Sequence, residues 1–271
     1  MENFQLTPLF NIIGIGAASG LVFKDNSLFI ISDNSTFLYQ FNISEKKLTK
    51  ISLVGSSQEN ILKKDKLDFE AITLKGNKLH IFGSGSTSKR EKRITYNLET
   101  NAVKEKSLTK LYKILKQTTQ ISDEDLNIEG ALFYNENLFL FQRGNGENSK
   151  NGVFKLNCKD NLDVKFTAID LPKIQNVEAT FTDAILVNDK IYFLAAVENT
   201  TSTYDDGEIL GSFIGCLILD TFELEFTKKI SETHKFEGLT LYNKTETTIE
   251  FLLCEDTDTE VLETTIYKLT L

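Results

Sequence analysis

The chain has 271 residues, of which 41% are hydrophobic, and its formal net charge is −9. Nucleic acids and anionic membrane surfaces are themselves negative, so this charge argues against both as partners and leaves cations and neutral small molecules. The length and apolar content suffice for a large core, and we expect one domain over residues 1–271.

The N-terminus lacks the basic start and apolar core of a secretory signal, and no apolar run reaches the length of a membrane span. Three cysteines, Cys158, Cys216 and Cys254, lie in or beside apolar strands without the spacing of metal ligands. An odd number in a chain of this length is typical of reduced, buried thiols. The sequence therefore predicts a cytoplasmic protein.

One short sequence motif, called the phrase below, repeats along the chain: a small or acidic pair, an apolar strand, a turn and a second apolar strand. It begins at Ser19, Glu70, Glu129, Asp183 and Glu237, so the copies are roughly fifty residues apart. Self-similarity at this period, with several short strands in each unit, is the signature of a β-propeller. We therefore predict an all-β fold, a five-bladed β-propeller.

The segments outside the repeats have separate roles. The N-terminal residues 4–10 form a surplus strand, and the last repeat is one strand short, so we expect the N-terminal strand to close the ring. Residues 108–117 have helical spacing and predict a short helix between blades two and three. A six-bladed ring is the alternative if residues 100–127 contain a degenerate blade. The longest loop, 198–211, is a candidate contact for a protein partner.

The first strand of each propeller blade lines the central channel, so the first residues of the five phrases should form a ring. Four of them are acids: Glu70, Glu129, Asp183 and Glu237. Four adjacent carboxylates need a cation, a raised pKa or a buried arginine. Calcium accepts six to eight oxygen ligands and is the simplest remedy. The alternatives are pairing with Arg143, hydrogen bonds to backbone amides, or solvated acids.

Polar residues at the ends of the second strands should lie at the same end of the channel and form a pocket with the acids. The candidate catalytic residues are Arg143, Glu198, His234 and Asp256. Arg143 follows an apolar strand and could hold a carboxylate or phosphate group of a substrate. Glu198, Asp256 or His234 would activate water. His80 lies within a strand and is expected to be structural.

Phrases such as Phe69-Glu70-Ala71 and Phe236-Glu237-Gly238 resemble those of an uncharacterised bacterial propeller family of unknown function. That family is distantly similar to esterase-like phytase and SdiA-regulated propellers. The resemblance implies a propeller with calcium at its axis that hydrolyses an ester, lactone or phosphoester. Calcium propellers such as gluconolactonase and paraoxonase use axial acids and an asparagine. Their nearest matches here are Glu70, Glu129, Asp183, Glu237 and Asn145.

The sequence thus predicts a small-molecule pocket on the propeller axis, centred on a calcium-like ion and acting as a hydrolase. Ser19 at one ring position and the presence of only two histidines depart from the esterase-like pattern. The alternative is a non-catalytic binding propeller, in which the acids are structural and the 198–211 loop contacts a protein or glycan.

Overall fold

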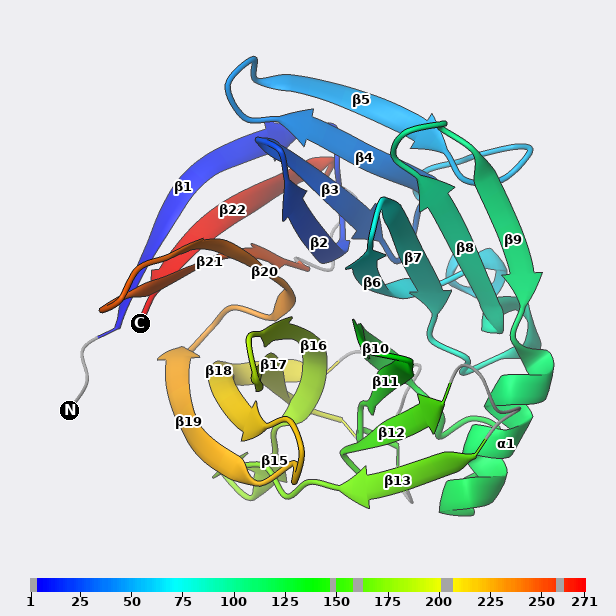
Figure 1. Ribbon diagram of the computed structural model, residues 1–271, viewed down its shortest axis with the longest axis vertical. Coiled ribbons are helices and arrows are strands. Elements are labelled where there is room, and N and C mark those ends of the chain that lie inside the picture. The colour runs from blue at the N-terminus through cyan, green and yellow to red at the C-terminus, as the bar shows by residue number, and fades with distance from the viewer. Residues whose placement is uncertain (1–3, 147–149, 158–162, 201–206, 257–260) are drawn as a thin grey trace.

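The computed structural model describes residues 4–146, 150–157, 163–200, 207–256 and 261–271. Five four-stranded sheets surround a central axis, as Figure 1 shows. Neighbouring strands within each sheet are antiparallel, and each sheet is one blade. The five-bladed β-propeller expected from the repeats is confirmed.

The blades follow one another along the chain. Blade one consists of β2 (Ala18–Lys24), β3 (Ser27–Ser32), β4 (Phe37–Asn42) and β5 (Lys47–Ser52). Blade two consists of β6 (Phe69–Lys75), β7 (Lys78–Gly83), β8 (Lys92–Asn97) and β9 (Val103–Ser107). Blade three consists of β10 (Ile128–Tyr134), β11 (Asn137–Gln142), β12 (Gly152–Asn157) and β13 (Val164–Ala168). Blade four consists of β16 (Thr180–Val187), β17 (Lys190–Asn199), β18 (Glu208–Ile218) and β19 (Leu224–Ser231). Blade five consists of β20 (Phe236–Lys244), β21 (Ile249–Glu255), β22 (Glu263–Thr270) and the N-terminal β1 (Gln5–Ile13).

Tight hairpins join the first and second strands. Between β2 and β3, Asp25 and Asn26 have φ angles of 49° and 60°, a conformation that Asp and Asn tolerate and that matches the twist of the flanking strands. The hairpin returns the end of each second strand to the start of the first, so that Phe69 pairs with Gly83 in blade two. Polar residues at these two places therefore meet at one end of the channel.

The innermost strands β2, β6, β10, β16 and β20 contact one another in a closed ring. Apolar clusters fill the spaces around them, and the one shared by blades three and four contains Phe141, Phe181 and Phe193, all fully buried. Their rings pack edge to face, with centroids 5.4 Å apart for Phe141 and Phe181 and 5.0 Å apart for Phe181 and Phe193. This close packing fixes the inner strands that carry the site.

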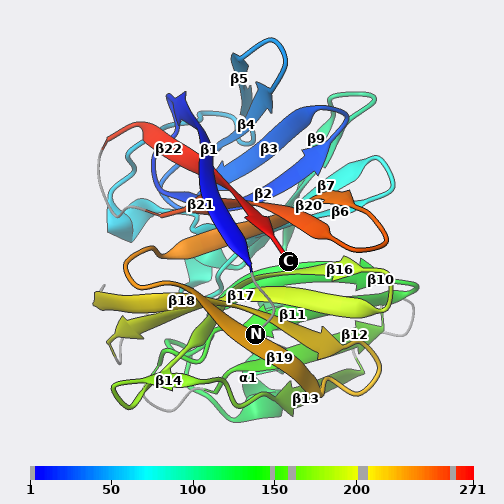
Figure 2. The ribbon, with the colours of Figure 1, turned by 90° about the vertical axis from the view of Figure 1, so that its left-hand side faces the viewer.

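The N-terminal strand closes the ring as expected. β1 pairs antiparallel with β22 from Gln5 opposite Thr270 to Ile13 opposite Glu263, and Figure 2 shows the two strands side by side. A register shift follows Pro8, as suits a residue that has no backbone N–H to give to the ladder. β1 covers the open edge of β22, which would otherwise be available for pairing with another chain.

A single α-helix, α1 (Thr109–Thr119), lies among the described residues beside blades two and three (Figure 1). Tyr112 and Leu115 are completely buried, and the Tyr112 hydroxyl donates a 2.7 Å hydrogen bond to the Gly83 carbonyl. Gly85 has a φ of +83°, and a Cβ there would lie 2.4 Å from the Tyr112 ring. Residues 100–127 thus contain β9 of blade two and this helix, and no sixth blade.

Three features differ from the sequence expectations or lie beyond them. A short hairpin, β14 (Lys173–Ile174) with β15 (Val177–Glu178), precedes blade four, and 3₁₀ turns occur at η1 (Lys63–Asp65) and η2 (Ser88–Arg90). The expected loop 198–211 is shorter, because strand pairing continues to Asn199 opposite Glu208. Its residues 201–206 and Cys158 lie outside the described residues.

Cys216 and Cys254 are buried free thiols, as expected. In the described part of the chain, no helix is both long enough and apolar enough to cross a membrane.

Candidate functional site

Each innermost strand carries a β-bulge at the same place, and the extra residue of each bulge marks the ring around the channel. Register shifts leave one residue without a partner in all five first strands. These residues are Ser19, Glu70, Glu129, Thr182 and Glu237. A bulge re-aims a side chain and bends its strand, so the repeated phrase encodes a repeated backbone irregularity.

The fourth ring position is therefore Thr182, and Asp183 lies one residue further along. The Thr182 hydroxyl donates to the Phe236 carbonyl at 2.6 Å, just as the Ser19 hydroxyl donates to the Phe69 carbonyl at 2.5 Å. Both bonds join one blade to the residue before the next bulge. The sequence phrase was aligned one residue late in blade four, because the apolar run after Asp183 resembles the other first strands.

Asp183 caps backbone amides. Its Oδ1 accepts a hydrogen bond from the Ala184 N–H, and its Oδ2 accepts one from the Leu239 N–H of blade five, both at 2.7 Å. Burial raises the pKa of Asp183, and the two amide donors act against that rise. This geometry matches the backbone-capping alternative rather than a shared ion.

A second ring lies beside the bulges. The backbone N–H of the residue after the second strand donates to the carbonyl of the residue two places before the bulge. The pairs are Asp33 with Ala17, Ser84 with Asp68, Arg143 with Asn127 and Asp256 with Lys235. The side chains after the second strands therefore converge on the end of the channel where the first strands begin, as predicted.

Arg143 is the centre of the charge network on the blade-three side. Its NH1 lies 3.1 Å from Glu129 Oε1, its NH2 donates to Glu198 Oε2, and its Nε donates to Thr180 Oγ1 at 3.2 Å. NH1 also lies 4.0 Å from Glu237 Oε1. Burial acts to lower the pKa of Arg143, but the surrounding glutamates outweigh it and hold that pKa above its ordinary value.

Lys235 neutralises the blade-five side, and sequence reasoning missed it. Its Nζ lies 3.1 Å from Glu237 Oε1 and 3.5 Å from Asp256 Oδ2, and all three side chains are buried. The sequence Lys235-Phe236-Glu237 could have indicated this role, because it places a lysine two residues before a ring glutamate. Glu129 is thus paired with Arg143 and Glu237 with Lys235. The predicted alternative of pairing with Arg143 therefore applies to Glu129, while a lysine has that role for Glu237.

Glu70 stands apart from the other ring acids. It makes no hydrogen bond or ion pair with any residue that the structure describes. Its carboxylate lies within 4.8 Å of carboxylate oxygens of Asp33 and Asp68. Burial, followed by Glu129 and Asp68, raises the pKa of Glu70 well above its ordinary value. Three acids on adjacent blades one and two therefore form a cluster that could hold a metal ion.

Each of the other two acids of this cluster pairs with a cation, and only Asp33 has an unsatisfied oxygen among the described residues. Asp33 Oδ2 pairs with Lys66, while its Oδ1 is buried without a hydrogen-bond partner among the described residues. Burial and then Asp256 raise the pKa of Asp33 to about 7. Asp68 Oδ2 pairs with Arg90 NH1 at 2.8 Å. Asp68 gives no signal in the sequence, because it reaches the cluster from the connector before β6.

The remaining predicted residues lie around this site. Glu198 Oε1 accepts the Gly207 N–H at 2.8 Å, in addition to the contact of its other oxygen with Arg143. His234 stacks on Phe236 with ring centroids 5.3 Å apart, its Nδ1 lies 2.7 Å from Ser231 Oγ, and its Nε2 lies 3.9 Å from Glu255 Oε2. His234 therefore belongs to the rim of blade five.

Asn145, matched to a calcium ligand by resemblance, is on the blade-three side of the site. Asn127 Nδ2 donates to Asn145 Oδ1 at 3.4 Å and to Glu129 Oε1 at 2.8 Å. Asn145 thus joins the Glu129 and Arg143 network, and the three acids near Glu70 form a separate group on blades one and two.

The closed ring of inner strands and the charged end of its channel define a five-bladed β-propeller with an acidic, partly neutralised centre. The chain belongs to the family of unknown function DUF6929, whose model matches residues 14–271. None of the curated proteins compared with the sequence matches it.

Solved structures share the fold over almost the whole chain. The crystal structure of Myxococcus xanthus glutaminyl cyclase has a TM-score of 0.55 and 10% identity, covering 97% of this chain and 96% of that one. The Malassezia sympodialis allergen Mala s 1 has a TM-score of 0.57 and 8% identity, covering 96% and 95%. An exo-1,5-alpha-L-arabinanase from a bovine ruminal metagenomic library has a TM-score of 0.54 and 8% identity, covering 94% and 92%. At these identities the likeness shows the propeller fold alone.

Proposed function

We propose that Asp33, Asp68 and Glu70 bind a divalent cation, calcium first, at the end of the propeller channel. The observation that carries this proposal is the buried Asp33 Oδ1, which has no hydrogen-bond partner among the described residues and belongs to the same cluster as Glu70. Leaving a buried acceptor unsatisfied is costly, and a bound cation would satisfy it.

The donor set suits a hard cation. All three groups are carboxylates, and calcium takes oxygen ligands in flexible geometry, with water or a ligand filling the remaining positions. Glu129 and Glu237 are assigned to the Arg143 and Lys235 network instead. This moves the ion from the symmetric centre of the ring, where the sequence suggested it, to the side formed by blades one and two.

We further propose that the site hydrolyses a small ester, lactone or phosphoester. A bound divalent cation supplies Lewis acidity toward a carbonyl or phosphoryl oxygen. Asp256, beside Lys235, and His234, on the blade-five rim, are the groups proposed to exchange protons with water. Arg143 and Glu198 hold the network that positions the ring, since their charged ends are buried against each other.

The buried free thiols Cys216 and Cys254 support a cytoplasmic location.

Turnover by metal-stripped protein tests this function. Ester, lactone and phosphoester substrates are assayed with and without calcium in the wild type, in Glu70→Gln, and in Glu246→Gln as a control at an exposed position. We expect calcium-dependent turnover that Glu70→Gln reduces at least a hundredfold and Glu246→Gln leaves unchanged. Calcium binding without turnover of any substrate contradicts the hydrolase and favours a binding propeller. Turnover that survives chelation contradicts the metal role.

A further inference from the structure

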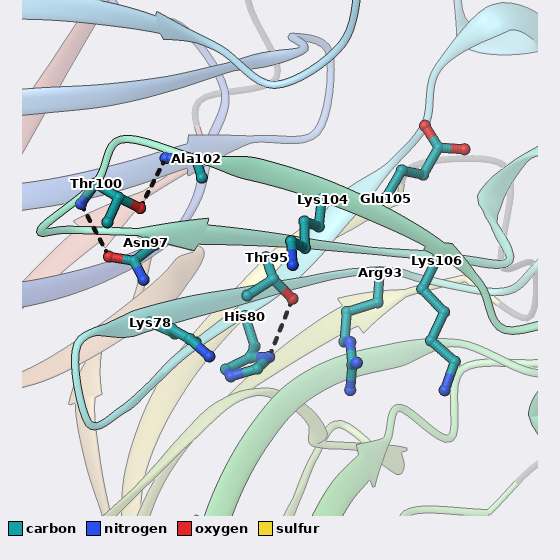
Figure 3. Close-up of a pocket in the computed structure, with 10 residues that line it drawn as sticks. All are labelled: Lys78, His80, Arg93, Thr95, Asn97, Thr100, Ala102, Lys104, Glu105 and Lys106. Carbon is teal, nitrogen blue, oxygen red and sulfur yellow. Dashed lines mark hydrogen bonds between the residues drawn. The ribbon is translucent and has the colours of Figure 1, made fainter.

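One face of the blade-two sheet carries basic and polar side chains in aligned rows. Opposite partners across the three outer strands place His80, Thr95 and Lys104 in one row and Arg93 and Lys106 in the next. Lys78, the first residue of β7, continues this face. Figure 3 shows these side chains projecting from the same side of the sheet.

The opposite face of the same sheet is apolar, as a blade interior should be. Leu79, Ile81, Ile94 and Tyr96 alternate with the polar residues and are at most 4% exposed in the cluster shared with blade one. Alternation along a strand sends successive side chains to opposite faces. The basic face therefore looks toward blade three, where a propeller would ordinarily bury apolar residues between blades.

Blade three covers only the inner end of this basic face. β10 packs against β6 and reaches β7, and Phe133 of β10 lies beside His80, with ring centroids 4.9 Å apart. Phe133 also lies 4.6 Å from Lys75 Nζ, measured to its ring centroid. Beyond Phe133 the basic face lines a cleft of about 500 Å³, and all of the lining residues belong to blade two. That volume falls within the range of small-molecule sites.

The cleft is positive on a negative protein. Lys78, Arg93, Lys104 and Lys106 line it together with a single acid, Glu105, whose carboxylate pairs with Lys92 at 2.9 Å. The whole chain carries a net charge of −9. A cleft lined with one sign of charge concentrates ligands of the opposite sign, while the overall charge disfavours a long polyanion such as nucleic acid.

His80 is held neutral at the floor of the cleft. Burial, then Arg93, Lys75 and Lys78, lower its pKa to about 4. Its Nδ1 lies 3.4 Å from Thr95 Oγ1. An anion bound among the same cations would reverse the electrostatic part of this effect, so the His80 imidazole is a built-in reporter of occupancy.

We propose that the cleft on the basic face of blade two binds a small anion carrying two or more phosphate groups. Lys78, Arg93, Lys104 and Lys106 are spread over three strands, so a ligand with more than one charged group can meet several of them together. Arginine offers a planar fork to phosphate oxygens, lysines add point charges, and the Thr95 hydroxyl adds a neutral donor. The site is separate from the carboxylate cluster in residues and in charge.

Tripolyphosphate is the probe for the test, which follows the Cε1–H resonances of the two histidines in the full chain by NMR with EDTA present. We expect saturable shifts of the His80 resonance, an upward shift of its pKa by at least one unit, and an unchanged His234 resonance. Lys104→Gln with Lys106→Gln, both at exposed positions, should weaken binding at least tenfold. Lys46→Gln with Lys47→Gln, equally exposed and of equal charge change, should not.

Three results would overturn the proposal: an unresponsive His80 resonance at millimolar tripolyphosphate, equal weakening by both double variants, or equal binding of sulfate at matched ionic strength. Citrate, a small polycarboxylate, separates phosphate recognition from general anion binding, and equal affinity for citrate contradicts the phosphate assignment. Because EDTA is present and Glu70→Gln can be measured in the same way, failure of the cation site leaves this test intact.

Discussion

At the scale of single residues, the acidic ring is balanced unevenly. Arg143 forms ion pairs with Glu129 and Glu198. Lys235 forms ion pairs with Glu237 and Asp256. Glu70 forms no ion pair with either of these cations. A buried ion pair contributes little net stability when intact, but removing one partner leaves an uncompensated buried charge. The intact network therefore adds little to the free energy of unfolding, but removing one of its charged residues should lower that free energy substantially.

Arg143→Gln should destabilise the protein by about 3–5 kcal/mol, because the remaining glutamates become unpaired. Urea unfolding measures this free energy. In the double variant Arg143→Gln with Glu198→Gln, part of the loss should return, since one of the stranded charges is gone. A loss below about 1 kcal/mol for Arg143→Gln, or simple additivity in the double variant, would contradict the assigned pairing.

His80 should make stability depend on pH between its two pKa values. The unfolded imidazole protonates near its ordinary pKa of 6.5, whereas the folded one does so at about 4. Its contribution is therefore complete above pH 6.5 and is lost as the pH falls toward 4, by about 1–2 kcal/mol once its partial exposure is discounted. Unfolding of wild type and His80→Gln across this window measures the difference. Parallel pH profiles would rule out the depressed pKa.

Sequence reasoning found part of the residue-level site. The repeated phrase located Glu70, Glu129 and Glu237, because a bulge at a fixed place in each blade repeats in sequence. Asp183 was placed one residue out of phase, although Phe181 before Thr182 corresponds to Phe69 before Glu70 and Phe236 before Glu237. Asp68 could not be found, because it approaches Glu70 only through the fold.

At the scale of elements, closure depends on β1 docking against blade one as well as pairing with β22. Ile12 is 1% exposed and belongs to the cluster with Leu21 and Ile30 of blade one, whereas the next residue, Ile13, is 79% exposed. Adjacent side chains of one strand thus point to the core and to solvent.

This pair gives a matched test of closure. Ile12→Ala should cost about 2–4 kcal/mol from lost burial and the cavity left behind, and Ile13→Ala should stay within about 0.5 kcal/mol. Denaturant midpoints of the two variants measure both values. Equal effects would mean that β1 does not dock in the register described.

Helices and strands were predictable from the sequence where their hydrophobic pattern was long enough to show a period. Alternating strands and the helical spacing near residues 109–119 were readable, because each is long enough to show its period. The β14–β15 hairpin has two residues in each strand and leaves no period to read. β17 and β18 extend through polar residues such as Glu198 and Asn199, which resemble a loop in composition but pair in the sheet.

At the scale of the whole molecule, five similar units surround an asymmetric centre. Arg143 and Lys235 each pair with two acids. Lys66 and Arg90 lie with the three acids of blades one and two, where Glu70 is the acid without an ion pair among the described residues. The cleft on the basic face of blade two has the opposite sign. Repetition was readable from sequence spacing, but this distribution of charge was not, since it depends on which side chains from different blades meet.

Thermal unfolding of EDTA-treated wild type and Glu70→Gln, each with and without calcium, tests the cation site most directly. If Glu70 is a ligand of a cation site, removing its charge should raise the midpoint of the metal-free protein by a few degrees. Calcium should raise the wild-type midpoint, with about 2.7 kcal/mol gained at a hundred times the dissociation constant, and should leave Glu70→Gln unchanged. A lower midpoint for metal-free Glu70→Gln, together with no calcium response in the wild type, would show instead that Glu70 is a structural acid.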